Sequence, residues 1–215
     1  MIQNPKPKRK YNSNRRQAQA GETRRQIMAA ARKLFYERGY AGTTIDAIAQ
    51  EAGVAQETVY SIFSNKQAIL LRIVNETIVG DDQPVALLQR PEILAAQNET
   101  DQHQLIQKFA RDIYEIMSRM SPVFELLRVS ARTDPEIAAL LEKILNGRLE
   151  GMTYFVGQLN RIGPLRESIQ LQDAQITAWT LSSAEVFDML TRHQAWSEDQ
   201  YVSWLSDALT RLLLP

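Results

Sequence analysis

Apolar residues recur every three or four positions along most of the chain, which is the period of an α-helix. The apolar stripes cover residues 27–35, 106–120, 137–159, 176–190 and 202–213. Prolines and glycines such as Gly21, Pro122 and Pro135 stand between these stripes, and we expect helices to end at them. The pattern predicts an all-α fold of about nine helices, because no run alternates between apolar and polar residues as a half-buried β-strand does.

The segment from Thr44 to Phe63 meets the physical requirements of a helix-turn-helix. Two short helices that cross steeply need a small residue at the crossing, which is Ala49. Gly53 suits the left-handed backbone conformation that the turn needs, and Thr44 is the expected N-cap of the first helix. Apolar anchors occupy the inward positions, namely Ile45, Ile48, Ala52, Val54, Val59 and Ile62. The second helix is left with an outward, mostly polar face.

Charge is divided unevenly along the 215 residues, although the net charge is zero. Residues 1–75 carry 13 Lys and Arg against 5 acids, and the remainder carries 12 against 20. A basic third joined to an acidic remainder favours a module that binds a polyanion. An ordinary helical hairpin with an inert outer face is the alternative, and Tyr60 among polar neighbours favours DNA binding.

The composition leaves little from which to build an enzyme or a metal site. The chain has no cysteine, and its two histidines, His103 and His193, lack the spacing of a zinc motif. We therefore expect no enzymatic activity, no metal and no cofactor. No apolar run has the roughly 18 residues of a membrane span, and the basic start lacks the apolar stretch of a secretion signal. A cytoplasmic protein without membrane contact is the expectation.

Residues 23–70 resemble the DNA-binding domain of the TetR family of bacterial transcription regulators. The agreement lies at Ala31, Phe35, Gly39, Thr44, Ile48, Ala49, Gly53, Val54, Thr58, Tyr60, Phe63 and Lys66. The sequence departs from the family at Ala55, Glu57 and Ser61, near the DNA surface, so the operator sequence is left open. The resemblance implies a basic flexible arm (1–20), a DNA-binding domain (21–67, motif 44–63) and a helical effector-binding and dimerisation domain (68–215).

The function implied is that of a ligand-responsive transcriptional regulator. A homodimer would bind double-stranded DNA at a palindromic operator and be released by a small-molecule effector. Repression is the family's usual role, and the sequence leaves activation open, as it leaves open whether the arm contacts DNA. The alternative is a helical ligand carrier or an enzyme with an incidental helix-turn-helix.

The second helix of the motif is expected to enter the major groove. Gln56 can pair with adenine, Tyr60 can hold a phosphate, and Glu57 can accept from cytosine or discriminate against wrong sites. The full set of expected DNA contacts is Thr44, Gln56, Glu57, Thr58, Tyr60, Ser61 and Lys66.

Arg148 interrupts an apolar stripe in the long helix that we expect from about Pro135 to Arg161. A guanidinium on a core-facing stripe requires compensation. One interpretation is an ion pair with Glu125 or Asp188, or an extended side chain that reaches the surface. The other is an effector pocket for an apolar body with or without an acidic group. Its expected residues are His103, Tyr114, Met117, Phe124, Arg148, Tyr154 and Trp179.

The last two helices are the candidate dimer surface, because they carry more large apolar side chains than a thin helix pair needs. The residues concerned are Trp179, Phe187, Tyr201, Trp204 and the stripe from Leu205 to Leu213. Packing within one protomer is the competing interpretation of each of them.

Overall fold

The computed structural model describes residues 11–80 and 98–215, which are helical and contain no β-strand. The predicted all-α fold is confirmed. The chain divides into two compact units, residues 1–73 and 74–215. Among the described residues, no helix is both long enough and apolar enough to cross a membrane.

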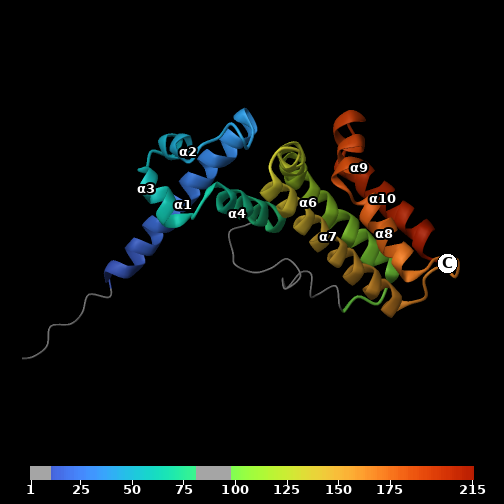
Figure 1. Cartoon of the computed structure of the whole chain (residues 1–215). Helices are drawn as coiled ribbons and strands as arrows, with labels where there is room; N and C mark the ends of the chain where they lie inside the picture. Colours follow the sequence, from blue (N-terminus) through green and yellow to red (C-terminus); the bar gives the residue numbers. More distant parts are fainter. Residues whose placement is uncertain (1–10, 81–97) are drawn as a thin grey trace, which may run out of the picture. The chain divides into compact units, whose positions relative to one another are not determined.

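The first unit is built on α1 (Tyr11–Arg38), on which α2 (Ile45–Ala52) packs, and α3 (Gln56–Ile62) packs in turn on α2 (Figure 1). A fourth helix, α4 (Lys66–Val79), begins in this unit and passes the boundary at residue 73. The apolar stripe of α1 forms the centre of the core, with Ile27, Ala31, Leu34 and Phe35 all at most 1% exposed. Burial of such side chains contributes about 25 cal/mol per Å² of apolar surface removed from water.

Helix α1 begins at Tyr11, so residues 11–20 of the predicted flexible arm are helical. Residues 1–10 of that arm lie outside the described residues. Gly21, which we expected to end a helix, lies inside α1 instead. Glycine within a helix costs about 1 kcal/mol relative to alanine, and the Gln, Ala and Arg residues on either side are good helix formers. A single glycine is therefore too weak a signal to end this helix.

The second unit consists of helices packed side by side, from α6 to α10 (Figure 1). Their bounds are α6 (Gln102–Ala131), α7 (Pro135–Ile162), α8 (Leu171–Leu181), α9 (Ala184–Asp188) and α10 (Glu198–Leu213), with a π-helical turn (Met189–His193) after α9. Helix α6 is central, because it packs on α7, α9 and α10, and α7 packs in turn on α8. Asp101, Asp134 and Ser197 cap the starts of α6, α7 and α10 with their side chains.

Helix α6 continues through Pro122, where we expected a boundary. A proline inside a helix removes one backbone hydrogen bond and costs about 3 kcal/mol or more. Buried side chains on both sides of the proline, among them Met120, Val123 and Phe124, are each at most 2% exposed. Ser121 also donates a hydrogen bond to the carboxylate of Asp188. Tertiary packing therefore offsets the local penalty and keeps the helix continuous.

The apolar stripe of α10 lies inside the second unit rather than on its surface. Leu205, Leu209 and Leu213 are 0% exposed, as is Tyr201, and Phe187 is 5% exposed. Packing within the protomer, the competing interpretation, therefore holds for these residues, whereas Trp179 and Trp204 are only half-buried and remain candidates for the predicted dimer surface. The exposed apolar side chains of these helices are instead Leu171 and Ile176 on α8 and Leu212 on α10, each between 44% and 46% exposed.

Candidate functional site

The turn between α2 and α3 has the backbone geometry that the sequence predicts. Thr44 is the N-cap of α2, and its hydroxyl accepts a hydrogen bond from the Ala47 amide at 3.1 Å. Gly53 ends α2 with φ 67° and ψ 31°, in the left-handed region. The Val54 amide then donates to the Ala49 carbonyl at 3.0 Å, which closes the turn.

The two helices are held by a small apolar core and by contacts to α1. Ile48 and Val59 are 0% exposed, and Ala49 at the helix crossing is 3% exposed. Thr43, which the sequence analysis did not single out, donates its buried hydroxyl toward the carbonyls of Leu34 at 3.1 Å and Gly39 at 2.9 Å. These contacts fix the chain between α1 and α2, so α3 is presented by a rigid support.

The outward face of α3 is exposed and has no core to cover it. Gln56, Glu57 and Ser61 are exposed, Tyr60 is 51% exposed, and Thr58 is half-buried. The Ser61 hydroxyl donates to the Thr58 carbonyl at 2.8 Å, so its oxygen remains available as an acceptor. The face thus offers an amide, a phenol, hydroxyl groups and one carboxylate to a partner.

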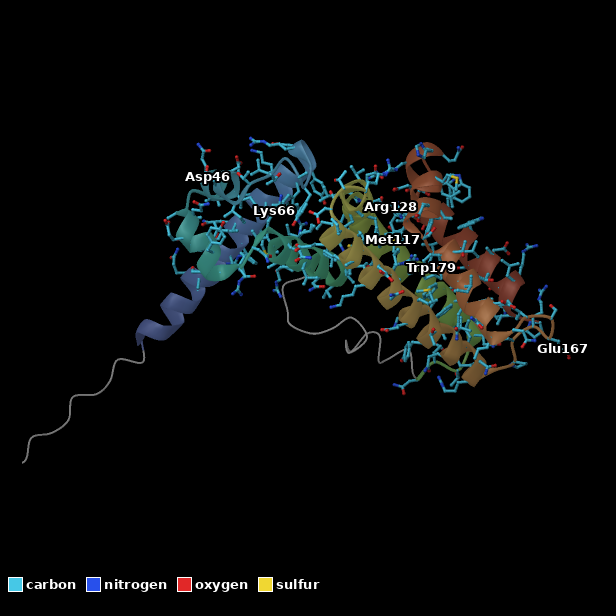
Figure 2. The ribbon with its side chains drawn as sticks, in the orientation of Figure 1. Asp46, Lys66, Met117, Arg128, Glu167 and Trp179 are labelled. Carbon is cyan, nitrogen blue, oxygen red and sulfur yellow. The ribbon has the colours of Figure 1, made fainter. Side chains whose placement is uncertain are left out.

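Lys66 lies at the start of α4 (Figure 2) and is engaged by backbone carbonyls of its own unit. Its ammonium donates to the carbonyls of Tyr40 at 2.7 Å and Thr43 at 2.8 Å, and lies 4.1 Å from the centre of the Tyr40 ring. The Asn65 side chain accepts from the Ala68 amide and caps the helix. This geometry gives Lys66 a positioning role, and the salt dependence of operator binding tests whether Lys66 also makes the phosphate contact that we expected.

In the second unit, Arg148 of α7 reaches the end of α8. One guanidinium nitrogen, Nη2, donates to the carbonyls of Trp179 at 3.0 Å and Ser182 at 3.1 Å, and to the Ser182 hydroxyl at 3.3 Å. The guanidinium also lies over the Trp179 ring, 5.2 Å from its centre. A cation at a helix C-terminus is favourable, because the last carbonyls lack partners within the helix.

Arg148 does not form the ion pair that we considered with Glu125 or Asp188. Asp188 accepts from Ser121 and pairs with Arg192 at 3.3 Å instead, and Glu125 is exposed. Burial lowers the pKa of Arg148 to about 10, an effect that the charge of Glu185 opposes. The guanidinium therefore stays protonated at neutral pH but at an electrostatic cost.

Aromatic side chains from α6, α9 and α10 meet inside the second unit. The Tyr201 ring of α10 lies 5.9 Å from the Tyr114 ring of α6 and 5.1 Å from the Phe187 ring of α9. The Tyr201 hydroxyl and the Trp179 indole nitrogen are buried and have no hydrogen-bond partner among the described residues. Burial raises the pKa of Tyr201, and the charge of Arg148 opposes this rise. The sequence analysis placed Tyr201 on the candidate dimer surface and did not connect it with Arg148, which lies on another helix.

Other predicted effector residues come from α6 and α8. Met117 and Trp179 lie among its helices (Figure 2), and Phe124 is buried beneath the guanidinium of Arg128. His103 is exposed in the first turn of α6, next to Gln102, which donates to the Leu159 carbonyl. At the rise of an α-helix, about 1.5 Å per residue, Leu159 lies about 16 Å from Arg148 along the axis of α7. The structure therefore separates His103 from Arg148.

The Tyr154 hydroxyl is a third buried polar group without a hydrogen-bond partner among the described residues. It comes from α7 itself, and six residues separate it from Arg148. At 3.6 residues per turn, this spacing directs the two side chains to different sides of the helix. Within residues 11–80 and 98–215, no group of three His, Asp or Glu side chains is arranged to hold a metal.

Comparison with known proteins identifies the first unit. Residues 27–73 match the family model of bacterial regulatory proteins of the tetR family. The HTH-type transcriptional regulator TtgR of Pseudomonas putida is 41% identical over 61 residues, which are 28% of this chain and 29% of that regulator. The match thus spans less than a third of the relative's own length. The sequence of the first unit is thus similar to that of bacterial regulatory proteins of the tetR family, and the resemblance seen in the sequence is confirmed.

Solved structures share the fold over most of the chain. NalD, the secondary repressor of the MexAB-OprM multidrug efflux pump in Pseudomonas aeruginosa, superposes with a TM-score of 0.68 and 20% identity, over 91% of this chain and 98% of NalD. The transcriptional regulator FadR from Bacillus subtilis, in complex with stearoyl-CoA, gives a TM-score of 0.59 and 20% identity, over 86% of this chain and 94% of FadR. At 20% identity, the similarity of the second unit to these two structures shows a shared fold.

Proposed function

We propose that this chain is a ligand-responsive transcriptional regulator that binds a palindromic operator as a homodimer. The observation that carries the proposal is the exposed polar face of α3, held on a rigid helix-turn-helix whose sequence matches the TetR family model. A helix that is polar on its outer face and fixed on its inner face is the form in which proteins present side chains to the major groove. Repression is the favoured direction, as in NalD.

Recognition of the operator rests on residues of α3 and on the start of α2, the other helix of the motif. Gln56 pairs with adenine, Thr58 and Ser61 reach base edges, and Tyr60 contacts phosphate. Glu57 accepts from cytosine or rejects wrong sites, and Thr44 offers the amino-terminal end of α2 to a phosphate. One short helix reads few base pairs, so two copies on a palindrome supply the remaining specificity. The exposed apolar residues Leu171, Ile176 and Leu212 are the favoured dimer contacts.

The second unit is proposed to bind the effector. The FadR structure holds stearoyl-CoA, which supports a small-molecule role for this helical fold. The residues proposed for this chain are those around Arg148, namely Tyr114, Met117 and Trp179, with Tyr201 added from the structure. Effector binding then favours a conformation with lower affinity for DNA.

Two variants of α3 test the DNA-binding proposal on an operator selected from genomic fragments by the purified protein. Gln56→Ala is expected to reduce the free energy of binding by about 1–3 kcal/mol, mainly on operators that retain the preferred base pair. Tyr60→Ala is expected to weaken binding to all sequences alike. Tyr36→Ala is the matched control, because Tyr36 is similarly exposed, at 47%, but lies on α1.

Binding is measured by fluorescence anisotropy of labelled duplexes over a range of salt concentrations. If Gln56→Ala and Tyr60→Ala both retain wild-type affinity and salt dependence, α3 is not the recognition helix. If the protein selects no fragment and instead converts a bound metabolite, it is an enzyme with an incidental helix-turn-helix.

A further inference from the structure

Three side chains of the second unit carry hydrogen-bond donors that no protein group accepts in the part of the chain that is described. The Tyr201 hydroxyl and the Trp179 Nε1 group are buried and have no partner among the described residues. The Arg148 guanidinium uses only Nη2 in its hydrogen bonds, to Trp179 and Ser182, so Nε and Nη1 have no protein acceptor in the part of the chain that is described. These groups come from α10, α8 and α7.

An unpaired buried donor costs about 1–3 kcal/mol, and most buried polar groups in proteins do find a partner. Phenylalanine at position 201 would have avoided this cost, because only the hydroxyl distinguishes the two side chains. Charged partners are absent as well, because Glu185 is occupied by Arg128 at 2.5 Å, and no carboxylate among the described residues is within ion-pair distance of Arg148. Arg148 therefore keeps its positive charge beside the Trp179 ring without a carboxylate partner, and the Trp179 and Tyr201 groups can each donate a hydrogen bond.

We infer that Arg148, Trp179 and Tyr201 bind the acidic group of an effector whose remaining body is apolar or aromatic. An anion accepts hydrogen bonds from a guanidinium, an indole N–H and a phenol alike, and its own charge makes each of these bonds stronger than a bond to a neutral acceptor. The rings of Tyr114 and Phe187, both in contact with the Tyr201 ring, supply the apolar surface for the body. The inference rests on the proposed function, because it names the chemical class of the effector.

Two dyes of nearly equal shape test the class of ligand. Anilinonaphthalene sulfonate carries an anionic group on an apolar aromatic body, and N-phenylnaphthylamine has the same body without the acid. Fluorescence titration of the full chain is expected to show about 10- to 100-fold tighter binding of the sulfonate. Arg148→Met removes that preference, and Arg132→Met, which removes an exposed arginine at the end of α6, leaves it unchanged.

Tyr201→Phe separates a ligand-binding role from a structural one. It removes only the unpaired hydroxyl, so the variant is expected to melt about 2–4 °C higher while it binds the sulfonate more weakly. A structural hydroxyl with a partner would give the opposite change in melting temperature. Tyr36→Phe in the first unit is the control and is expected to alter neither quantity. Tyr201→Phe also keeps the inference testable if Arg148→Met fails to fold because the end of α8 has lost its cap.

The outcomes distinguish the class of effector from the proposed function. Equal affinity for the two dyes, or a Tyr201→Phe variant that melts lower or binds the sulfonate as the wild type does, overturns the inference. Operator binding, measured on the same preparation, tests the proposed function independently of the inference about the effector. If DNA binding persists in that case, the regulator remains and only the acidic effector is wrong. If DNA binding is also absent, the proposed function fails with it.

Discussion

Replacing Gly53 by alanine changes the turn between α2 and α3 through the backbone alone. Gly53 has φ 67°, which residues with a Cβ rarely adopt, yet a Cβ built there meets no atom within 4 Å. The cost is therefore conformational rather than a clash, and left-handed backbone costs about 1–2 kcal/mol for an ordinary L-residue. Gly53→Asn is expected to cost less, because asparagine is enriched several-fold in this region.

A second glycine provides a control of opposite sign. Gly157 lies inside α7 without a positive φ, and a Cβ there also meets nothing within 4 Å. Gly157→Ala is expected to stabilise the second unit by about 0.5–1 kcal/mol, because alanine loses less backbone entropy in a helix. Replacing glycine by alanine thus raises the free energy of unfolding at position 157 and lowers it at position 53.

Hydrogen exchange measured by mass spectrometry is the suitable assay, because the three tryptophans all lie outside the first unit and do not report on it. A loss of 1–2 kcal/mol raises the exchange rate of protected amides in α2 and α3 by about 5- to 30-fold. Peptides from α7 serve as the internal reference. Unchanged exchange in Gly53→Ala, or equal rates for alanine and asparagine at this position, would refute the reasoning.

Three further substitutions follow from side chains whose surroundings differ from our expectations. Lys66→Met loses the contacts to Tyr40 and Thr43 and is expected to destabilise the first unit by about 1–3 kcal/mol in thermal unfolding. The slope of operator affinity against salt should remain unchanged, whereas loss of a phosphate contact would lower it by about 0.9. Leu209→Glu places a charge at a position that is 0% exposed and should unfold the second unit, seen as a lost cooperative melt. Leu212→Glu, at a position 45% exposed, should keep the melt and shift light scattering toward monomers; a folded Leu209→Glu dimer would contradict this assignment.

The helix-turn-helix could be predicted from the sequence because its requirements are local. A left-handed turn needs glycine at position 53, a steep crossing needs a small residue at position 49, and the N-cap of α2 needs a side-chain acceptor at position 44. Each requirement involves residues only a few positions apart, so periodicity and residue type are sufficient. The exposed face of α3 follows from the same pattern.

Only the tertiary structure decided the roles of Arg148, Lys66 and Pro122. The acceptors of Arg148 lie 31 and 34 residues away in the chain, and those of Lys66 lie 26 and 23 residues away. No local pattern specifies such partners, so the sequence could show that Arg148 needs compensation but not that the end of α8 provides it. Helix α6 likewise continues through Pro122 because burial on both sides outweighs a local penalty. The chemistry of a side chain thus determines which kind of partner it needs, and long-range packing decides which group of the protein is that partner.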